Sequence, residues 1–288
     1  MANIAAGRKS AYRLQPWNLF LYIALTLGVV IVAVPMYWTI AASFMTRAEA
    51  IATRWVPSVP QFQNYVVAWQ EANFSEYFIN SVIITLITIV GLVIFSVLAA
   101  YAFARMEFIG KNFLFTLLIT TLFIPEMVLL LPNFLLVTWL GRIGPIAWID
   151  NWPALTIPFM GNIFFIFLLR QFFAQIPDDL FDAAKIDGAS HLQFLIRIVL
   201  PLSKAPLMTV IMLAFIGSWN ALSWPLLVTN SAEWRPIAVG LTNFLNEEAQ
   251  RLHLQMAGAV ITMLPVLLLY FFTQKQFTEG IAQSGLKG

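Results

Sequence analysis

Long stretches without charged residues constrain this chain more than any other feature. A helix needs about 20 residues to cross the roughly 30 Å hydrocarbon core of a bilayer, and the apolar stretches approach or exceed that length. Because lipid gives backbone groups no hydrogen-bonding partner, each stretch is predicted to be a helix. The predicted spans lie within 17–44, 77–104, 113–139, 153–169, 206–229 and 254–274.

Only 10% of the 288 residues are charged and 60% are hydrophobic, whereas a typical soluble domain carries about 25% charged residues. A chain of this composition cannot bury so much apolar surface in water. We therefore predict an all-α integral membrane protein with six transmembrane helices. The first apolar segment is expected to stay in the protein as a span, because no small-residue cleavage site follows a short apolar core.

Basic residues are distributed unevenly between the two sides of the predicted membrane. Six spans place both termini on one side, and eleven of the 16 Lys and Arg residues fall on that side. Cytoplasmic loops carry an excess of Lys and Arg, so both termini are predicted to be cytoplasmic. The predicted organisation is an N-terminal tail 1–16, a first span with a long external loop 17–76, a transmembrane core 77–275 and a C-terminal tail 276–288.

The composition also argues against several function classes. The chain has no Cys, which removes disulfides, thiol catalysis and Cys-based metal sites. Its two His residues are isolated, so no metal site is predicted. A net charge of +2 provides no basic surface for nucleic acid. The chain has no Gly-rich phosphate loop with Lys-Ser or Lys-Thr, so it is not expected to hydrolyse ATP or to bind a cofactor.

A polar segment separates the fourth and fifth spans on the predicted cytoplasmic side. Pro177 suits the first turn of a helix, and Asp178 and Asp179 follow where the helix dipole favours acids. Gly188 is expected to end this helix in the left-handed backbone conformation. One face of the helix would carry Leu180, Ala183 and Ala184.

A second short helix is predicted directly afterwards. Ser190 can cap it, and Gln193 three residues later completes a capping box. Pro201 is expected to end the helix, whose apolar residues are Leu192, Leu195, Ile196 and Val199. Two capped helices around a glycine turn form either a solvated linker or a docking hairpin for a cytoplasmic partner. A linker would need neither the caps nor the apolar face.

This hairpin resembles the Glu-Ala-Ala (EAA) loop of ABC importer permeases. That motif consists of Glu-Ala-Ala, three residues, Gly, nine residues, Ile, one residue and Leu-Pro, and the segment 182–201 matches its spacing. Asp182 replaces the Glu, which keeps the charge on a shorter side chain. The resemblance implies a coupling loop 175–201 that docks on an ATPase subunit through Asp182, Ala183, Ala184, Asp187, Gly188, Ile198, Leu200 and Pro201.

Other segments resemble carbohydrate importer permeases of the maltose-transporter type. They are NSVIITLITIVGLVIFSVLAAYAFAR from Asn80, GSWNALSWPLLV from Gly217 and the final GLKG. The resemblance implies a type I permease fold in a prokaryotic plasma or inner membrane, a second homologous permease subunit and an ATPase pair. It also implies an extracytoplasmic solute-binding protein and a carbohydrate substrate. The chain would be a transport subunit and not an enzyme, with ATP and Mg²⁺ bound by the ATPase partner.

Few residues are candidates for the solute pathway. Glu126 is the only formal charge within a predicted span, where a central charge costs about 2.5–3.5 kcal/mol on insertion scales. It would contact solute, or form a salt bridge or hydrogen bond to the partner permease. Trp219 and Asn220, predicted in the middle of the fifth span, suit a sugar's ring faces and hydroxyls, but equally suit helix packing. Asn133 and Asn162 are weaker candidates.

Two alternative functions remain open from the sequence. An ion-coupled secondary transporter could use Glu126 as a proton or cation site, although the inverted repeats common in such proteins are not found. An ABC permease could also carry another solute, such as a glycerol phosphodiester or a polyamine. Dependence of uptake on ATP hydrolysis instead of the proton gradient would separate the first alternative from an ABC permease.

Overall fold

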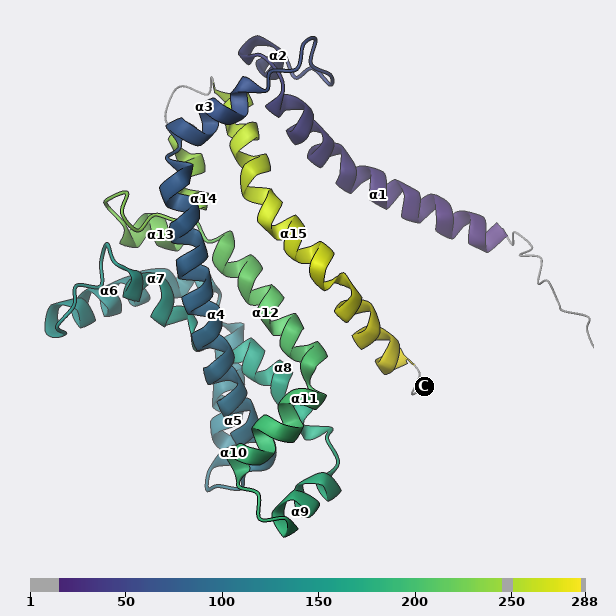
Figure 1. Cartoon of the computed structure of the whole chain (residues 1–288), viewed down its shortest axis with the longest axis vertical. Coiled ribbons are helices and arrows are strands. Elements are labelled where there is room, and N and C mark those ends of the chain that lie inside the picture. Colours follow the sequence, from purple (N-terminus) through teal and green to yellow (C-terminus); the bar gives the residue numbers. More distant parts are fainter. Residues whose placement is uncertain (1–15, 245–250, 286–288) are drawn as a thin grey trace, which may run out of the picture.

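The computed structural model describes residues 16–244 and 251–285, and every regular element in these ranges is helical (Figure 1). Long apolar helices include α1 (Pro16–Ser43), α4 (Phe74–Arg105), α12 (Lys204–Trp219) and α15 (Leu252–Gly285). The other elements are α2 (Arg47–Ile51), α3 (Gln63–Glu71), α5 (Lys111–Thr120), η1 (Thr121–Phe123), α6 (Glu126–Ile143), α7 (Trp152–Thr156), η2 (Ile157–Phe159), α8 (Ile163–Ala174), α9 (Asp178–Ile186), α10 (His191–Phe194), η3 (Leu195–Val199), α11 (Leu200–Leu202), α13 (Ser223–Val228), α14 (Ile237–Gly240) and η4 (Leu241–Phe244).

Helix α4 is the centre of the bundle and packs against α8 and α12. Its buried face carries small or hydroxyl side chains at helical spacing, namely Ser81, Thr85, Thr88, Ser96 and Ala100. Small side chains let membrane helices approach closely, and Ser and Thr hydroxyls can bond across the interface. Ser218 on α12 uses this arrangement, because its Oγ lies 3.2 Å from the hydroxyl of Thr85.

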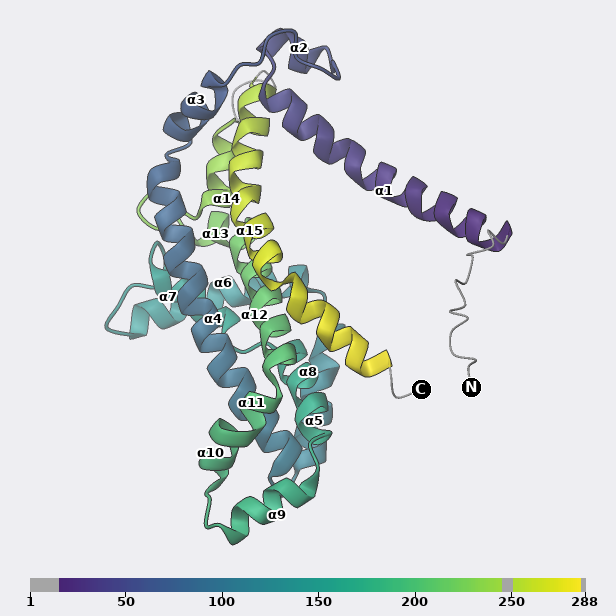
Figure 2. The same ribbon diagram turned by 45° about the vertical axis from the view of Figure 1, so that its right-hand side comes forward.

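The long external loop predicted after the first span is packed against the helices. Asn64 in α3 is buried, and its Nδ2 donates to the backbone oxygens of Ser43 and Met45 at 2.9 and 2.8 Å. Glu49 in α2 accepts a hydrogen bond from the backbone N–H of Ser58 at 3.0 Å. These bonds fix α2 and α3 at one end of the molecule, opposite α9 (Figures 1 and 2).

Helix α1 diverges from the rest of the bundle in both views (Figure 2). It meets the other helices near its C-terminal end, where Ala41, Ala42 and Met45 are buried against Leu252 and Met256 of α15. The most apolar part of the span 17–43 has no residue buried in this chain. Lipid or another protein must therefore cover this helix.

The described residues contain four helices that could each cross a membrane, or up to six if each of two bent helix pairs is one span. The prediction of one continuous third span, 113–139, is wrong, because the helix stops before Pro125 and restarts as α6. The residue before a proline is disfavoured in helical conformation. Ile124 accordingly has an extended backbone, with φ −83° and ψ 118°.

The fourth and fifth predicted spans are also interrupted. Helix α8 starts only after a break at 160–162 and forms a bend of 40° with the α7–η2 segment. Helix α12 stops at Trp219, and α13 begins at Ser223. Pro158 and Pro225 lie beside these breaks, and each lacks the N–H that a continuous helix needs. The carbonyl of Ala154, four residues before Pro158, instead accepts a hydrogen bond from the indole of Trp224 at 2.8 Å.

Candidate functional site

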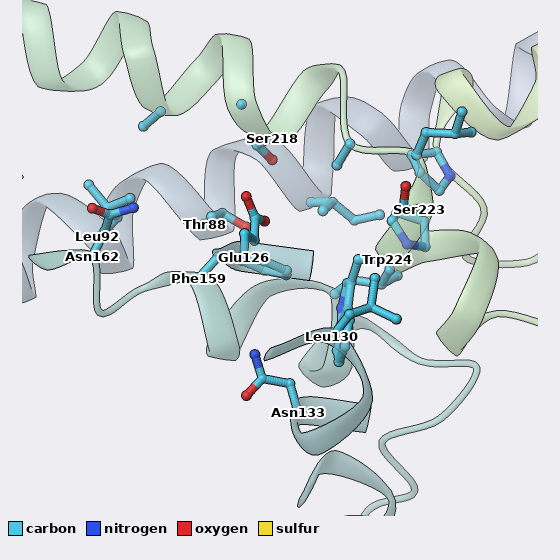
Figure 3. Close-up of a pocket in the computed structure, with 18 of the residues that line it drawn as sticks. Thr88, Leu92, Glu126, Leu130, Asn133, Phe159, Asn162, Ser218, Ser223 and Trp224 are labelled. Carbon is cyan, nitrogen blue, oxygen red and sulfur yellow. The ribbon is translucent and has the colours of Figure 1, made fainter. Parts of the chain in front are cut away.

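The three helix breaks meet around one cavity of about 420 Å³ (Figure 3). Helix breaks within a membrane are tolerated where they line a cavity or are buried in protein, so their convergence marks a site. The cavity is lined by Ser81, Ile84, Thr88, Leu92, Glu126, Met127, Leu130, Asn133, Leu155, Phe159, Asn162, Phe165, Leu213, Ala214, Gly217, Ser218, Ala221, Leu222, Ser223, Trp224, Pro225 and Pro236.

Glu126 is the first residue of α6 and directly follows the break at Pro125. It therefore lies at a helix N-terminus and not within a continuous span, where the partial positive charge of the helix favours a carboxylate. Its side chain is exposed in this chain and lines the cavity. It carries the only formal charge among the lining residues, all of which the structure describes.

Thr88 of α4 is a cavity residue that the sequence reasoning missed. Its side chain is only 4% exposed, and its Oγ1 has no hydrogen-bonding partner. Thr88 and Glu126 line the same cavity (Figure 3). Buried hydroxyls are nearly always bonded, so an unbonded one at a cavity wall is suited to a polar ligand. The second predicted span shows a stripe of Ser and Thr residues in the sequence, but that stripe does not single out Thr88.

Asn133 and Asn162 also line the cavity. Asn133 lies seven residues after Glu126 and therefore on the same face of α6. Asn162 caps α8, and its Oδ1 accepts from the N–H groups of Phe164 and Phe165 at 3.0 and 3.4 Å. The structure thus brings together three of the polar residues that the sequence singled out, together with Thr88.

Trp219 and Asn220 do not line the cavity. They end α12, so the expectation that they sit in the middle of a helical span is wrong. Trp219 is 2% exposed, stacks on Phe215 with ring centroids 5.4 Å apart, and donates from Nε1 to the oxygen of Thr262 at 3.0 Å. These contacts are those expected if Trp219 packs helices together instead of contacting a sugar. Asn220 is exposed, and its N–H caps the helix by donating to Ile216.

The polar hairpin between α8 and α12 has the predicted first helix and turn. Helix α9 has Asp178 and Asp179 in its first turn. Asp187 is its C-cap residue, and Gly188 has φ +78°, in the left-handed region. Ala184 is 7% exposed and packs into the core of α4, α8 and α12. Asp182 and Ala183 are exposed, so the same helix presents an outward face.

The second part of the hairpin differs from prediction at its end. The capping box of Ser190 and Gln193 is present. Pro201, however, does not stop the helix, which continues through the π-helical segment η3 and through α11 to Leu202. A π turn is wider than an α turn, so the chain passes a proline that would clash with the carbonyl four residues back in a regular α-helix. Ile198 and Leu200 are half-buried there.

Arg105 at the end of α4 joins the hairpin to the bundle. Its side chain is 6% exposed, and its Nε donates to the carbonyl of Phe173 at 3.0 Å. The same group also bonds to the carbonyl of Ile176 and to the carboxylate of Asp178. One side chain therefore links the C-terminus of α8, the N-terminus of α9 and α4.

Comparisons with known proteins agree with this architecture. Residues 92–283 match the family model described as "Binding-protein-dependent transport system inner membrane component". The chain is 32% identical over 280 residues to the sn-glycerol-3-phosphate transport system permease protein UgpE of Brucella abortus (strain 2308), covering 93% of this chain and 96% of that protein. It is 31% identical over 233 residues to the arabinooligosaccharides transport system permease protein AraQ of Bacillus subtilis, covering 81% of each chain.

The fold matches one chain of a bacterial ABC transporter involved in the import of the acidic polysaccharide alginate. That match has a TM-score of 0.78 and 24% identity, and it covers 95% of this chain and 99% of the other. At this identity the likeness concerns the fold, which is that of an ABC importer permease. By its family match and its relatives, the chain belongs to the inner membrane components of binding-protein-dependent transport systems, as a multi-pass transport subunit and not an enzyme.

Proposed function

We propose that this chain forms half of the transmembrane pathway of an ATP-driven importer, for a carbohydrate that an extracytoplasmic binding protein delivers. The single observation that carries this proposal is the polar cavity at three converging helix breaks within a family of transport subunits. The lining offers Thr88, Asn133 and Glu126 to sugar hydroxyls, and Phe159 and Trp224 to apolar ring faces.

The α9–α11 hairpin is proposed to dock on an ATPase subunit and to transmit its motion. Its outward face carries Asp182 and Ala183, while Ala184 ties the inward face to the core. The match of 182–201 to the EAA spacing supports this role. ATP and Mg²⁺ would be bound by the ATPase partner, and this chain would bind no cofactor.

The hairpin is proposed to lie in the cytoplasm together with both termini. The excess of Lys and Arg on that side supports this orientation. A second, homologous permease is proposed to complete the pathway and to cover part of α1. The exposed apolar surface of α1, which stands away from its own bundle in Figure 1, supports such a neighbour.

A phosphorylated glycerol solute is the second candidate. It is favoured by the 32% identity to a sn-glycerol-3-phosphate permease over nearly the whole length of both chains. The AraQ relative favours a neutral oligosaccharide at almost the same identity. The earlier alternative of an ion-coupled secondary transporter finds no support in either comparison.

ATP hydrolysis by the assembled transporter tests the proposal. The complex would be reconstituted with its binding protein and offered arabinotriose, other neutral oligosaccharides, sn-glycerol 3-phosphate and uronate oligosaccharides. We expect at least one carbohydrate to stimulate hydrolysis and to accumulate in the vesicles. Stimulation by non-carbohydrate solutes alone would contradict the carbohydrate assignment.

A further inference from the structure

The charge of the cavity distinguishes between the solutes carried by the relatives. Of its lining residues, which the structure describes completely, Glu126 alone is charged, and none is Lys, Arg or His. We propose that Glu126 makes this half of the pathway select against anions, so that the solute is a neutral carbohydrate. This inference rests on the proposed function and specifies its substrate class.

Two basic side chains on helices that line the cavity, Arg142 and Arg170, are not among its lining residues. Arg142 lies at the far end of α6, 16 residues away, which is about 24 Å along a helix. Arg170 of α8 lies over the ring of Phe115, with its Cζ 4.4 Å from the ring centroid. Phosphate and carboxylate groups are usually held by Arg or Lys, and the cavity wall provides neither.

The same wall suits uncharged hydroxyls. A carboxylate accepts hydrogen bonds from sugar hydroxyls without needing a cation, and the unbonded Oγ1 of Thr88 at the wall of the same cavity can donate or accept (Figure 3). The burial of Thr88 shows that its hydroxyl is held at the wall and is not a loose surface group. A neutral polyol can therefore use both groups, whereas an anion would be repelled by Glu126.

The absence of cysteine from this chain allows a direct test. Ser223→Cys places one thiol on the exposed cavity wall. In the assembled transporter, its modification by an anionic and by a cationic methanethiosulfonate reagent of similar size would be followed by the mass of this chain. With Glu126 present, we expect the ratio of the cationic to the anionic reaction rate to be roughly tenfold higher than the ratio measured for the same two reagents on a free thiol. With Glu126→Gln, this preference should fall to about the free-thiol value.

Glu107→Gln is the matched control, because it removes the same charge from a loop side chain that is 91% exposed and does not line the cavity. Glu107→Gln should leave the preference for the cationic reagent unchanged. Glu126→Asp retains the charge, so it should also preserve this preference, and it can be measured if Glu126→Gln does not assemble.

Equal reaction of the two reagents with Glu126 present would overturn the inference, including the case in which a cation of the partner permease neutralises this carboxylate. A preference that persists in Glu126→Gln would overturn it as well. Uptake by the same complexes separates this inference from the proposed function. Transport of a carbohydrate without charge discrimination would refute only the inference about Glu126. Transport of no carbohydrate would refute the proposed function.

Discussion

Gly188 has a backbone conformation that most residues cannot adopt without strain. Its φ is +78°, and a Cβ added there would meet no atom within 4 Å, so the cost of substitution is conformational and not steric crowding. For a residue with a Cβ that cost is roughly 1–2 kcal/mol. The prediction from sequence that Gly188 ends α9 in the left-handed region is confirmed by this angle.

Gly188→Val should leave the chain inserted and assembled but reduce the solute transported per ATP hydrolysed, because the strained turn would misorient α9. Paired measurements of uptake and ATP hydrolysis in proteoliposomes check this. Gly188→Asn is the control, since Asn tolerates the left-handed region better than other residues with a Cβ. Transport at the wild-type ratio in Gly188→Val would contradict the coupling role.

Thr88→Val should separate stability from function. The buried Oγ1 has no partner, and removal of an unsatisfied buried group is expected to stabilise the chain by about 1 kcal/mol. Carbohydrate uptake should nevertheless fall several-fold. Thermal unfolding tests the predicted gain in stability, and uptake assays test the predicted loss of transport. Thr85→Val is the control, because that hydroxyl bonds to Ser218, so its loss should lower stability. Unchanged uptake in Thr88→Val would remove Thr88 from the site.

Glu49 gives the loop after α1 a pH dependence. Hydrogen bonds from the Ser58 side chain and from the backbones of Thr46 and Ser58 lower its pKa from 4.5 to about 2. A depressed pKa means that the stabilisation is complete above pH 4.5 and is lost as the pH falls to about 2. Amide exchange at 46–58 should therefore be faster in Glu49→Gln than in wild type at pH 6. The two proteins should converge towards pH 2, and a constant difference would contradict this explanation.

At the scale of elements, the ends of helices separate what sequence can predict from what it cannot. Local chemistry was sufficient to predict the hairpin, because the capping box of Ser190 and the glycine turn depend on neighbouring residues alone. The breaks inside the third, fourth and fifth predicted spans were missed, because hydropathy is averaged over a segment and does not report its backbone conformation. Pro125 and Pro225 were visible signals, but prolines also occur inside intact helices, as Pro35 does in α1.

Arg105 is predicted to couple α9 to α4 mechanically. Arg105→Gln removes the charge-assisted bond to Asp178 and weakens those to the carbonyls of α8 and its following turn, at a cost of about 2 kcal/mol. We expect faster amide exchange in α9 and less solute transported per ATP. Lys111→Gln is the control, because it removes a basic side chain whose partner, Glu107, lies outside α9. Normal exchange in α9 of Arg105→Gln would exclude this link.

At the scale of the whole molecule, the cavity is the feature least accessible to sequence. Thr88, Glu126 and Ser223 come from α4, α6 and α13, and only the folded arrangement brings them to one wall. Glu126 could be singled out because a charge is rare in an apolar segment. Thr88 could not, because a Thr in a membrane helix usually bonds within the helix, as Thr138 bonds to Phe134. Trp219 was the reverse case, since its indole suits a sugar but is used for packing.

The central claim is that this chain conducts solute only when a separate ATPase drives it through the α9–α11 hairpin. The most direct measurement is the initial rate of labelled carbohydrate uptake into proteoliposomes, with and without the ATPase subunits and with ATP inside the vesicles. Uptake should require both the ATPase and ATP. Equal accumulation of the solute against its gradient by the permease subunits alone would contradict the account.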